Sequence, residues 1–240
     1  MLKISNFEVM GWEHAIRGMR NPMNSWEKSD SVVCEWGLRP ECACCEDRHT
    51  DRCVNGFVIG NNDLTLMLKL CIAGTDHRKF MRMITVYLDI TAPLYWWKEF
   101  DTYKVGTVAN SCSTMHKIAE KEFMEEDFSF EHIYSASEDN PGDWVANQIY
   151  VETQHIISAL NAARIKYLQT QNKSYWWQMI QLLPSSYNQK RTVMLNYEVL
   201  ANIYKSRRNH KLDEWHTFCN WIEELPYSEL ITGYEEEEDK

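Results

Sequence analysis

The chain has 240 residues, 44% of them hydrophobic, and a formal net charge of −10 at pH 7. This length can bury the core of one large domain or of two small ones. The acidic balance argues against a nucleic-acid polymer as the partner. No apolar run reaches the roughly 18 residues of a membrane span, and the N-terminus lacks the apolar stretch of a secretory signal. We therefore expect a cytoplasmic protein that does not enter membranes.

A cysteine-rich segment at residues 32–56 follows 31 residues that are only weakly periodic. Without a secretory signal these cysteines are expected to be reduced thiols, and thiolates are good zinc ligands. The spacing of these cysteines matches no common zinc ribbon or finger, so two interpretations remain open: a structural zinc site, or a surface insertion with free thiols. The candidate zinc ligands are Cys34, Cys42, Cys44, Cys45 and Cys53.

Four elements are predicted after this insertion. The spacing of apolar residues indicates a helix that begins at Asn62-Asp63 and ends before Gly74. Residues 82–90 alternate between apolar and polar side chains, which is typical of a half-buried strand. Pro93 follows that strand and suits the first turn of an aromatic-rich helix. Residues 105–114 lose the helical pattern and are predicted to form a loop that approaches a ligand.

The second half of the chain is predicted to be mostly helical. Asp143 and the preceding Asn-Pro-Gly are expected to cap a long helix that runs to Leu168. Further helices are predicted at residues 175–183, 190–206 and 210–225. The pattern indicates one α+β domain over residues 1–233, rich in helix and with a small, mostly antiparallel sheet. Residues 234–240 carry five acidic side chains and are expected to be disordered.

The first segment with candidate site residues ends in a run of small polar side chains, Asn110-Ser111-Cys112-Ser113-Thr114. Hydroxyls, a thiol and backbone amides in so short a span are typical of anion-binding loops. Cys112 would be a nucleophile if a nearby cation lowered its pKa, whereas most single cysteines are inert. Lys104 lies just before this run and could neutralise a phosphate.

The second such segment contains Asn196, Asn202 and a basic stretch at residues 205–211. Asparagine amides beside an apolar helical stripe either cap buried backbone groups or bind the donor and acceptor edges of a ligand. Arg207 and Arg208 at a helix C-terminus either interact favourably with the helix dipole or bind a phosphate. The phosphate interpretation expects Asn209 to cap the next helix and to hold the two arginines in a sharp corner.

These two segments resemble the flavin-dependent thymidylate synthases. That family has Ala-Pro and an aromatic helix, a signature RHRxxSxNxxSxR, a Leu-Pro break, a helix of the form NARxLxxFLxxR and a closing helix that opens with AQWE. The corresponding residues here are Ala92-Pro93 with aromatic residues 95–97, Leu183-Pro184, and Asp213-Glu214-Trp215. Asn196, Asn202 and Arg207 reproduce the spacing of Asn, Asn and Arg in the NAR helix.

The resemblance implies a homotetramer with active sites between subunits. The FAD-binding residues would be Thr102, Tyr103, Lys104, Thr107, Asn196 and Asn202. The residues that bind dUMP, or a related deoxyuridylate, would be Glu99, Asn110, Ser111, Arg207 and Arg208, and the catalytic residues would be Cys112 and Ser113. The implied reaction transfers a one-carbon unit from methylenetetrahydrofolate to C5 of the pyrimidine, with NADPH as the reductant.

Several positions depart from the family pattern. Thr102, Tyr103 and Lys104 stand where the family has Arg-His-Arg, so one positive charge remains there. The last arginine of the signature becomes Thr114 or Met115, Glu198 replaces the arginine of NAR, and Met83 aligns with a family histidine. A divergent, viral-type member acting in the host cytoplasm would fit these changes. They also leave two alternative functions open: a nucleotide-binding protein without flavin chemistry, or an interaction protein organised by zinc in the cysteine segment.

Overall fold

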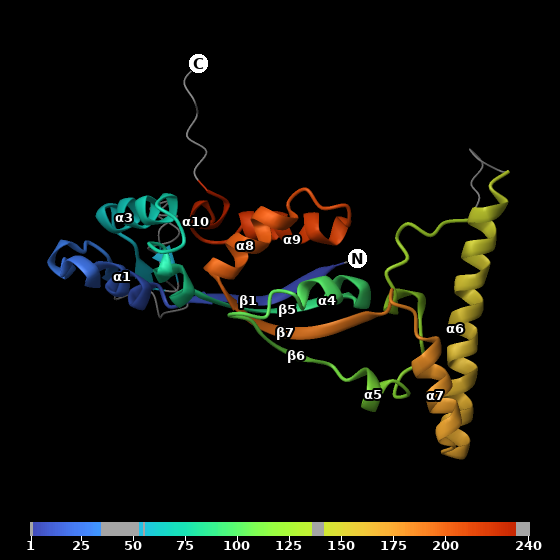
Figure 1. The fold of residues 1–240 in the computed structure, drawn as a ribbon. Coiled ribbons are helices and arrows are strands. Elements are labelled where there is room, and N and C mark those ends of the chain that lie inside the picture. The colour runs from blue at the N-terminus through green and yellow to red at the C-terminus, as the bar shows by residue number, and fades with distance from the viewer. Residues whose placement is uncertain (1, 35–52, 55, 136–141, 234–240) are drawn as a thin grey trace. The chain divides into compact units, whose positions relative to one another are not determined.

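The computed structural model describes residues 2–34, 53–54, 56–135 and 142–233 (Figure 1). The chain divides into two compact units. Unit 1 consists of Met1–Lys3, Ile90–Thr102 and Asn110–Arg191, and unit 2 consists of Ile4–Asp89, Tyr103–Ala109 and Thr192–Lys240. Helices outnumber strands along the chain, which confirms the predicted helix-rich α+β class.

The main sheet has four strands in the order β1-β5-β7-β6. These strands are β1 (Lys3–Met10), β5 (Thr85–Pro93), β6 (Val108–Ser111) and β7 (Asn188–Asn196). A second sheet of three short antiparallel strands, in the order β2-β4-β3, is formed by Val32–Val33, Phe57–Val58 and Cys53–Val54. On β5, Val86, Leu88 and Ile90 are fully buried and alternate with more exposed residues. This is the strand predicted from the alternation at residues 82–90.

Unit 2 is mostly helical and has an aromatic core. Its helices are α1 (Trp12–Arg20), α3 (Asn61–Ile72), α8 (Tyr197–Arg207), α9 (Asp213–Glu223) and α10 (Glu229–Thr232), with 3₁₀ helices at Asn21–Met23, Trp26–Lys28 and Lys79–Met83. The ring of Trp12 meets the ring of Tyr197 edge-on, with 5.3 Å between centroids. The Tyr197 hydroxyl donates to the carbonyl oxygen of Pro226 at 2.5 Å, and burial raises the pKa of this phenol. Tyr197 thereby fixes the start of α8 in the core.

Unit 1 contains a helical hairpin of α6 (Trp144–Thr170) and α7 (Lys173–Leu182). The Asp143 carboxylate accepts a hydrogen bond from the Ala146 amide at 3.0 Å, which confirms the predicted N-cap of α6. The hairpin packs on a core that includes Phe123 and Phe128. The remaining helices of unit 1 are α4 (Leu94–Phe100), α5 (Thr114–Lys117) and a 3₁₀ helix at Glu125–Asp127. The large apolar side chains of α4, Trp96, Trp97 and Phe100, are buried.

The helix predicted over residues 190–206 is wrong in its first part. Strand β7 occupies Asn188–Asn196, and α8 begins only at Tyr197. Val193 and Leu195 are buried at alternate positions, as in a strand. In the sequence, the apolar residues at the end of this strand and those of the following helix together have the spacing of one apolar helix face. Strand β6 similarly lies where the sequence predicts a loop. The N-cap of α9 is Leu212, not Asn209, so the predicted corner at Asn209 is also wrong.

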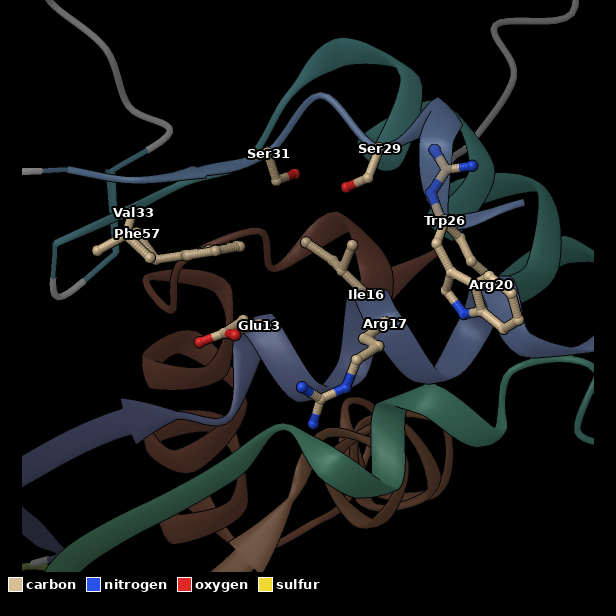
Figure 2. Close-up of a pocket in the computed structure, with 9 residues that line it drawn as sticks. All are labelled: Glu13, Ile16, Arg17, Arg20, Trp26, Ser29, Ser31, Val33 and Phe57. Atoms are coloured by element: carbon tan, nitrogen blue, oxygen red, sulfur yellow. The ribbon is translucent and has the colours of Figure 1, made fainter. Parts of the chain in front are cut away.

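A buried ion pair connects α1 to α3. Arg20 Nε donates to Asp63 Oδ1 at 2.6 Å, and both side chains are at most 5% exposed. Asp63 Oδ2 also accepts hydrogen bonds from the hydroxyls of Ser29 at 2.7 Å and Ser31 at 2.6 Å. Figure 2 shows Arg20, Ser29 and Ser31 among the residues around a cavity beside this network. Burial alone would raise the pKa of Asp63, but the hydrogen bonds from Ser31, Ser29 and Arg20 hold it below its usual value.

Replacement of Asp63 by Asn should lower the free energy of unfolding by about 3–5 kcal/mol at pH 7, because it leaves the buried Arg20 without its counter-charge. Chemical denaturation of the native chain and the variant measures this loss. The depressed pKa means that Asp63 stabilises the fold above the unfolded-state value of about 3.9 and that this contribution is lost as pH falls through the lower folded value. The variant should lack that acid-dependent loss.

The matched control is Asp76→Asn, which removes the same charge from an exposed side chain. Its free energy of unfolding should stay within about 0.5 kcal/mol of the native value. Equal losses in the two variants would show that the Arg20–Asp63 network does not support the fold.

Candidate functional site

The predicted site residues fall into two groups, and each group belongs to one unit. Unit 2 contains Tyr103, Lys104, Thr107, Asn196, Asn202, Arg207 and Arg208. Unit 1 contains Glu99, Thr102, Asn110, Ser111, Cys112 and Ser113. Each group forms an arrangement of its own.

Arg207 lies at the end of α8 against two aromatic rings, and we call Tyr103, Arg207 and Trp215 the Arg207 cluster. Arg207 Nε donates to the Tyr103 hydroxyl at 2.9 Å. The guanidinium carbon lies 4.8 Å from the centroid of the Trp215 ring and 5.6 Å from that of the Tyr103 ring. These contacts hold the guanidinium in one position. The cluster therefore presents a preorganised planar cation, which suits a phosphate or a carboxylate.

The segment Tyr103–Ala109 packs against α8 within unit 2. Gly106 has a φ of +83°, and a Cβ there would lie 3.0 Å from Asn196 Nδ2 and 3.1 Å from Val199 Cγ2. The neighbouring Thr107 hydroxyl is buried and has no hydrogen-bond partner in the described part of the chain. A buried hydroxyl without a partner is unfavourable unless a ligand or a water bonds to it. Thr107 therefore marks a position where a polar ligand group fits.

The two asparagines predicted to bind cofactor lie in different environments. Asn196 is 9% exposed, and its Oδ1 accepts a hydrogen bond from the Val199 amide at 3.0 Å, so it is the N-cap of α8. Asn202 is exposed in the middle of α8 and, with Arg208, lines a cavity beside α3 and α10. The structure thus places Asn202 and Arg208 on a different face of α8 from the Arg207 cluster.

Glu198, which the resemblance places at the arginine of the NAR motif, forms an ion pair with Arg78. Arg78 Nε lies 2.9 Å from Glu198 Oε2, and Arg78 Nη2 donates to Glu198 Oε1 at 3.2 Å. The Glu198 side chain is 9% exposed. Its negative charge is therefore balanced within the protein, and the first turn of α8 presents no cation of its own. Lys104 is exposed in the segment beside α8.

In unit 1, a cavity of about 440 Å³ is lined by both predicted catalytic residues, Cys112 and Ser113. The Cys112 amide donates to the Lys190 carbonyl at 2.9 Å, and the Cys112 carbonyl accepts from Gln189 Nε2 at 2.8 Å. Ser113 Oγ accepts a hydrogen bond from the His116 amide at 3.0 Å. The two bonds of Cys112 fix its backbone against β7, and Cys112, Ser113 and Thr114 line the cavity.

Further polar side chains around this cavity are not apparent from the sequence. Lys117 and Lys121 line it, and each forms an ion pair, with Glu120 and Asp127 respectively. Tyr187 also lines it, and burial raises the pKa of its phenol, so the hydroxyl stays protonated and able to donate. The Leu-Pro break, whose Pro184 lies three residues before Tyr187, is the nearest sequence signal, but it predicts a turn and not a ligand contact.

The other predicted site residues of unit 1 do not line this cavity. Asn110 and Ser111 are exposed on β6 and are not among the residues that line the cavity. The Thr102 hydroxyl donates to the Glu99 carbonyl at 2.7 Å, at the end of α4. Arg191, a cation near these residues, pairs with Asp101 at 2.8 Å and lies 4.1 Å from the Trp97 ring centroid. It therefore fastens α4 to β7.

The predicted zinc ligands lie mostly outside the described residues. Cys34 is half-buried, whereas Cys42, Cys44, Cys45 and the side chain of Cys53 are not described. Within residues 2–34, 53–54, 56–135 and 142–233, no group of three or more His, Cys, Asp or Glu side chains could hold a metal ion. The same ranges contain no helix that is both long and apolar enough to cross a membrane.

No protein-family model and no curated protein matches the sequence. Thymidylate synthase X (ThyX) from Helicobacter pylori, solved with FAD and dUMP, is similar in structure, with a TM-score of 0.63 and 14% identity over 97% of each chain. A second structure of this flavin-dependent enzyme with FAD and dUMP gives 0.57 and 16% over 96% of each chain. The UMP/dUMP methylase PolB from Streptomyces cacaoi gives 0.49 and 14%, over 69% of this chain and 76% of PolB. The chain thus has the flavin-dependent thymidylate synthase fold, as the resemblance implies.

Replacement of Gly106 by Ala should destabilise the fold by about 2 kcal/mol, because it combines an unfavourable positive φ with contacts to Asn196 and Val199. Gly74→Ala is the matched control, since Gly74 has a φ of +100° and no atom within 4 Å of an added Cβ. Thermal denaturation should therefore show a smaller loss for Gly74→Ala. Equal losses would contradict a close contact between the 103–109 segment and α8.

Proposed function

We propose that this chain is a flavin-dependent methylase of dUMP or of a related deoxyuridylate. The Arg207 cluster carries this proposal, because a planar cation held by a hydroxyl and two rings suits the phosphate of a nucleotide. It lies on the helix whose Asn, Asn and Arg spacing resembles that of the family. The fold supports the proposal further, since the Helicobacter pylori enzyme that shares it was solved with FAD and dUMP.

The residues of unit 2 fit a bound nucleotide cofactor. The unpaired Thr107 hydroxyl would bond to a polar group of FAD, and the exposed Lys104 would balance negative charge. When bound, FAD supplies the redox chemistry that links NADPH and methylenetetrahydrofolate to the pyrimidine. In the overall reaction the C5–H bond of dUMP is replaced by C5–CH₃, and the C5 proton passes to solvent. The carbon comes from methylenetetrahydrofolate, whose bonds to it break to leave tetrahydrofolate, and NADPH provides the hydride that completes the methyl group.

The protein's own contribution is to bind and orient the nucleotide. Arg207 would hold the phosphate, because its guanidinium is fixed by Tyr103 and Trp215. Within unit 1, the cavity lined by Cys112 and Ser113 has a volume of about 440 Å³, which can accommodate a pyrimidine ring. There the Cys112 thiol and the Ser113 hydroxyl would face the ring, and the protonated Tyr187 could donate to a ring carbonyl.

FAD added at micromolar concentration should bind to the purified chain, with a shifted absorption spectrum and quenched fluorescence. With FAD present, Arg207→Gln should weaken dUMP binding by about 10- to 100-fold, because a hydrogen bond to a charged group contributes about 1.5–3 kcal/mol. Isothermal titration calorimetry measures this change.

The matched control is Arg208→Gln, which removes the same charge one residue away on another face of α8. Its dUMP affinity should equal that of the native chain. If both substitutions weakened dUMP binding equally, Arg207 would not be the residue that binds the phosphate. An unchanged flavin spectrum would remove the enzyme proposal itself.

We also propose that the chain forms a homo-oligomer, the tetramer that the resemblance implies. Helix α6 leaves large apolar side chains exposed, including Trp144 at 70%, Ile149 at 48% and Ile165 at 49%. Each of these side chains is a candidate interface contact, because large apolar side chains are buried in the cores of protein interfaces. Light scattering after gel filtration should give the tetramer mass for the native chain and a lower mass for Ile149→Lys. Met23→Lys is the control, because Met23 is 82% exposed in unit 2, and an equal loss of mass would contradict an interface on α6.

The second candidate function is a nucleotide-binding protein without flavin chemistry. Its support is that three predicted cofactor residues already have partners in the protein: Asn196 caps α8, Thr102 donates to Glu99, and Tyr103 accepts from Arg207. Thermal stabilisation by dUMP in a chain that shows no flavin binding would favour this function over the enzyme.

A further inference from the structure

A cavity of about 390 Å³ lies in unit 2 on the face of α8 that does not carry the Arg207 cluster. Side chains from α3, from the turn that follows it, from α8 and from α10 line the cavity. On α8 the lining residues Asn202, Lys205 and Arg208 are three positions apart, so they share one face of the helix. The polar wall of the cavity is therefore built on one rigid element.

The two cations of this wall differ from the three arginines that form ion pairs within the fold. Arg20, Arg78 and Arg191 each form an ion pair with an acidic side chain. Lys205 and Arg208, by contrast, form no ion pair with any acidic residue in the described ranges, although the chain has ten more acidic than basic residues. Arg208 instead lies over the ring of Tyr204, 6.0 Å from its centroid. Both charges thus remain available at the cavity.

The position of Lys205 and Arg208 could be explained without a ligand, because cations near a helix C-terminus interact favourably with the helix dipole. That explanation does not account for Asn202, an exposed amide in the middle of the helix that faces the same cavity. It also does not account for Ile72, which lines the cavity from α3 and is 69% exposed. Around one hollow, an amide, an apolar surface and three cations, of which Arg78 is paired with Glu198, are the features of a site for an organic anion.

We propose that this cavity is a second anion-binding site, which takes a ring-bearing organic dianion. Lys205 and Arg208 bind the charged group, Asn202 bonds to an edge of the ligand, and Ile72 covers the ring. Glu229, which lines the cavity from α10, accepts a hydrogen bond from an amino group on the ring. Folates and purine nucleotides share this chemistry: the first carry two carboxylates and the second a phosphate, and both carry a ring amino group.

The test is calorimetric titration of the full chain with 5-formyltetrahydrofolate and, separately, with AMP. At least one of these probes should bind the native chain with a Kd below about 1 mM. The Lys205→Gln/Arg208→Gln variant should bind that probe about tenfold more weakly or worse, as expected when charge-assisted bonds to a ligand are lost. The probe that binds identifies the charged group that the site prefers.

Two further variants make the test specific. Lys166→Gln/Lys211→Gln removes the same total charge from exposed positions outside the cavity and should leave the Kd unchanged. Arg207→Gln should also leave it unchanged, which separates this site from the proposed dUMP site. Absence of binding by both probes, or equal losses in the two double variants, would overturn the proposal. Neither result would affect FAD or dUMP binding, because Arg207 and Thr107 are not part of this cavity.

Discussion

The change from strand β7 to helix α8 at Asn196 and Tyr197 determines where the candidate site residues of unit 2 lie. The Asn196 side chain caps the helix, and the Tyr197 amide donates to the Ile84 carbonyl at 3.0 Å. The Tyr197 hydroxyl is bonded to Pro226 inside the core. The backbone amide and the hydroxyl of Tyr197 are thus both hydrogen-bonded, and Asn196 caps the first turn of the helix. Because these groups are held, the rotation of α8 about its axis is fixed. Arg207 therefore points to Tyr103 and Trp215. Lys205 and Arg208 instead line the cavity beside α3 and α10.

The distribution of cations separates residues that stabilise the fold from residues that could bind a ligand. Arg20 and Arg78 are paired with buried carboxylates, and removal of either partner would leave an uncompensated charge. Arg207 is held by the Tyr103 hydroxyl and by aromatic faces, which orient its guanidinium. Glu198 belongs to the residues that stabilise the fold, since its charge is balanced by Arg78. Arg207 thus places one oriented guanidinium on the helix whose spacing resembles that of the family.

The sequence predicts elements with strong local signals and fails where two elements join without one. Asp143 after Pro-Gly predicts the start of α6 correctly, and the alternation around Val86 predicts β5. The junction at Asn196 contains no glycine or proline that would mark the end of the strand, so the sequence predicts a single helix over the end of β7 and α8. Proximity in the sequence groups Asn202 and Arg208 with Arg207, although they line a cavity on another face of α8. The cavity around Cys112 was only half predicted, because Tyr187 and Lys121 reach it through tertiary packing, which no local pattern reports.

The central claim is that this fold methylates a deoxyuridylate at C5 with the help of a flavin. The most direct test uses dUMP labelled with tritium at C5, together with the chain, FAD, NADPH and methylenetetrahydrofolate. Replacement of the C5–H bond by a C5–CH₃ bond releases the tritium to water. The account predicts tritium release that requires FAD and accompanies formation of dTMP. A chain that binds FAD and dUMP but releases no tritium would contradict it.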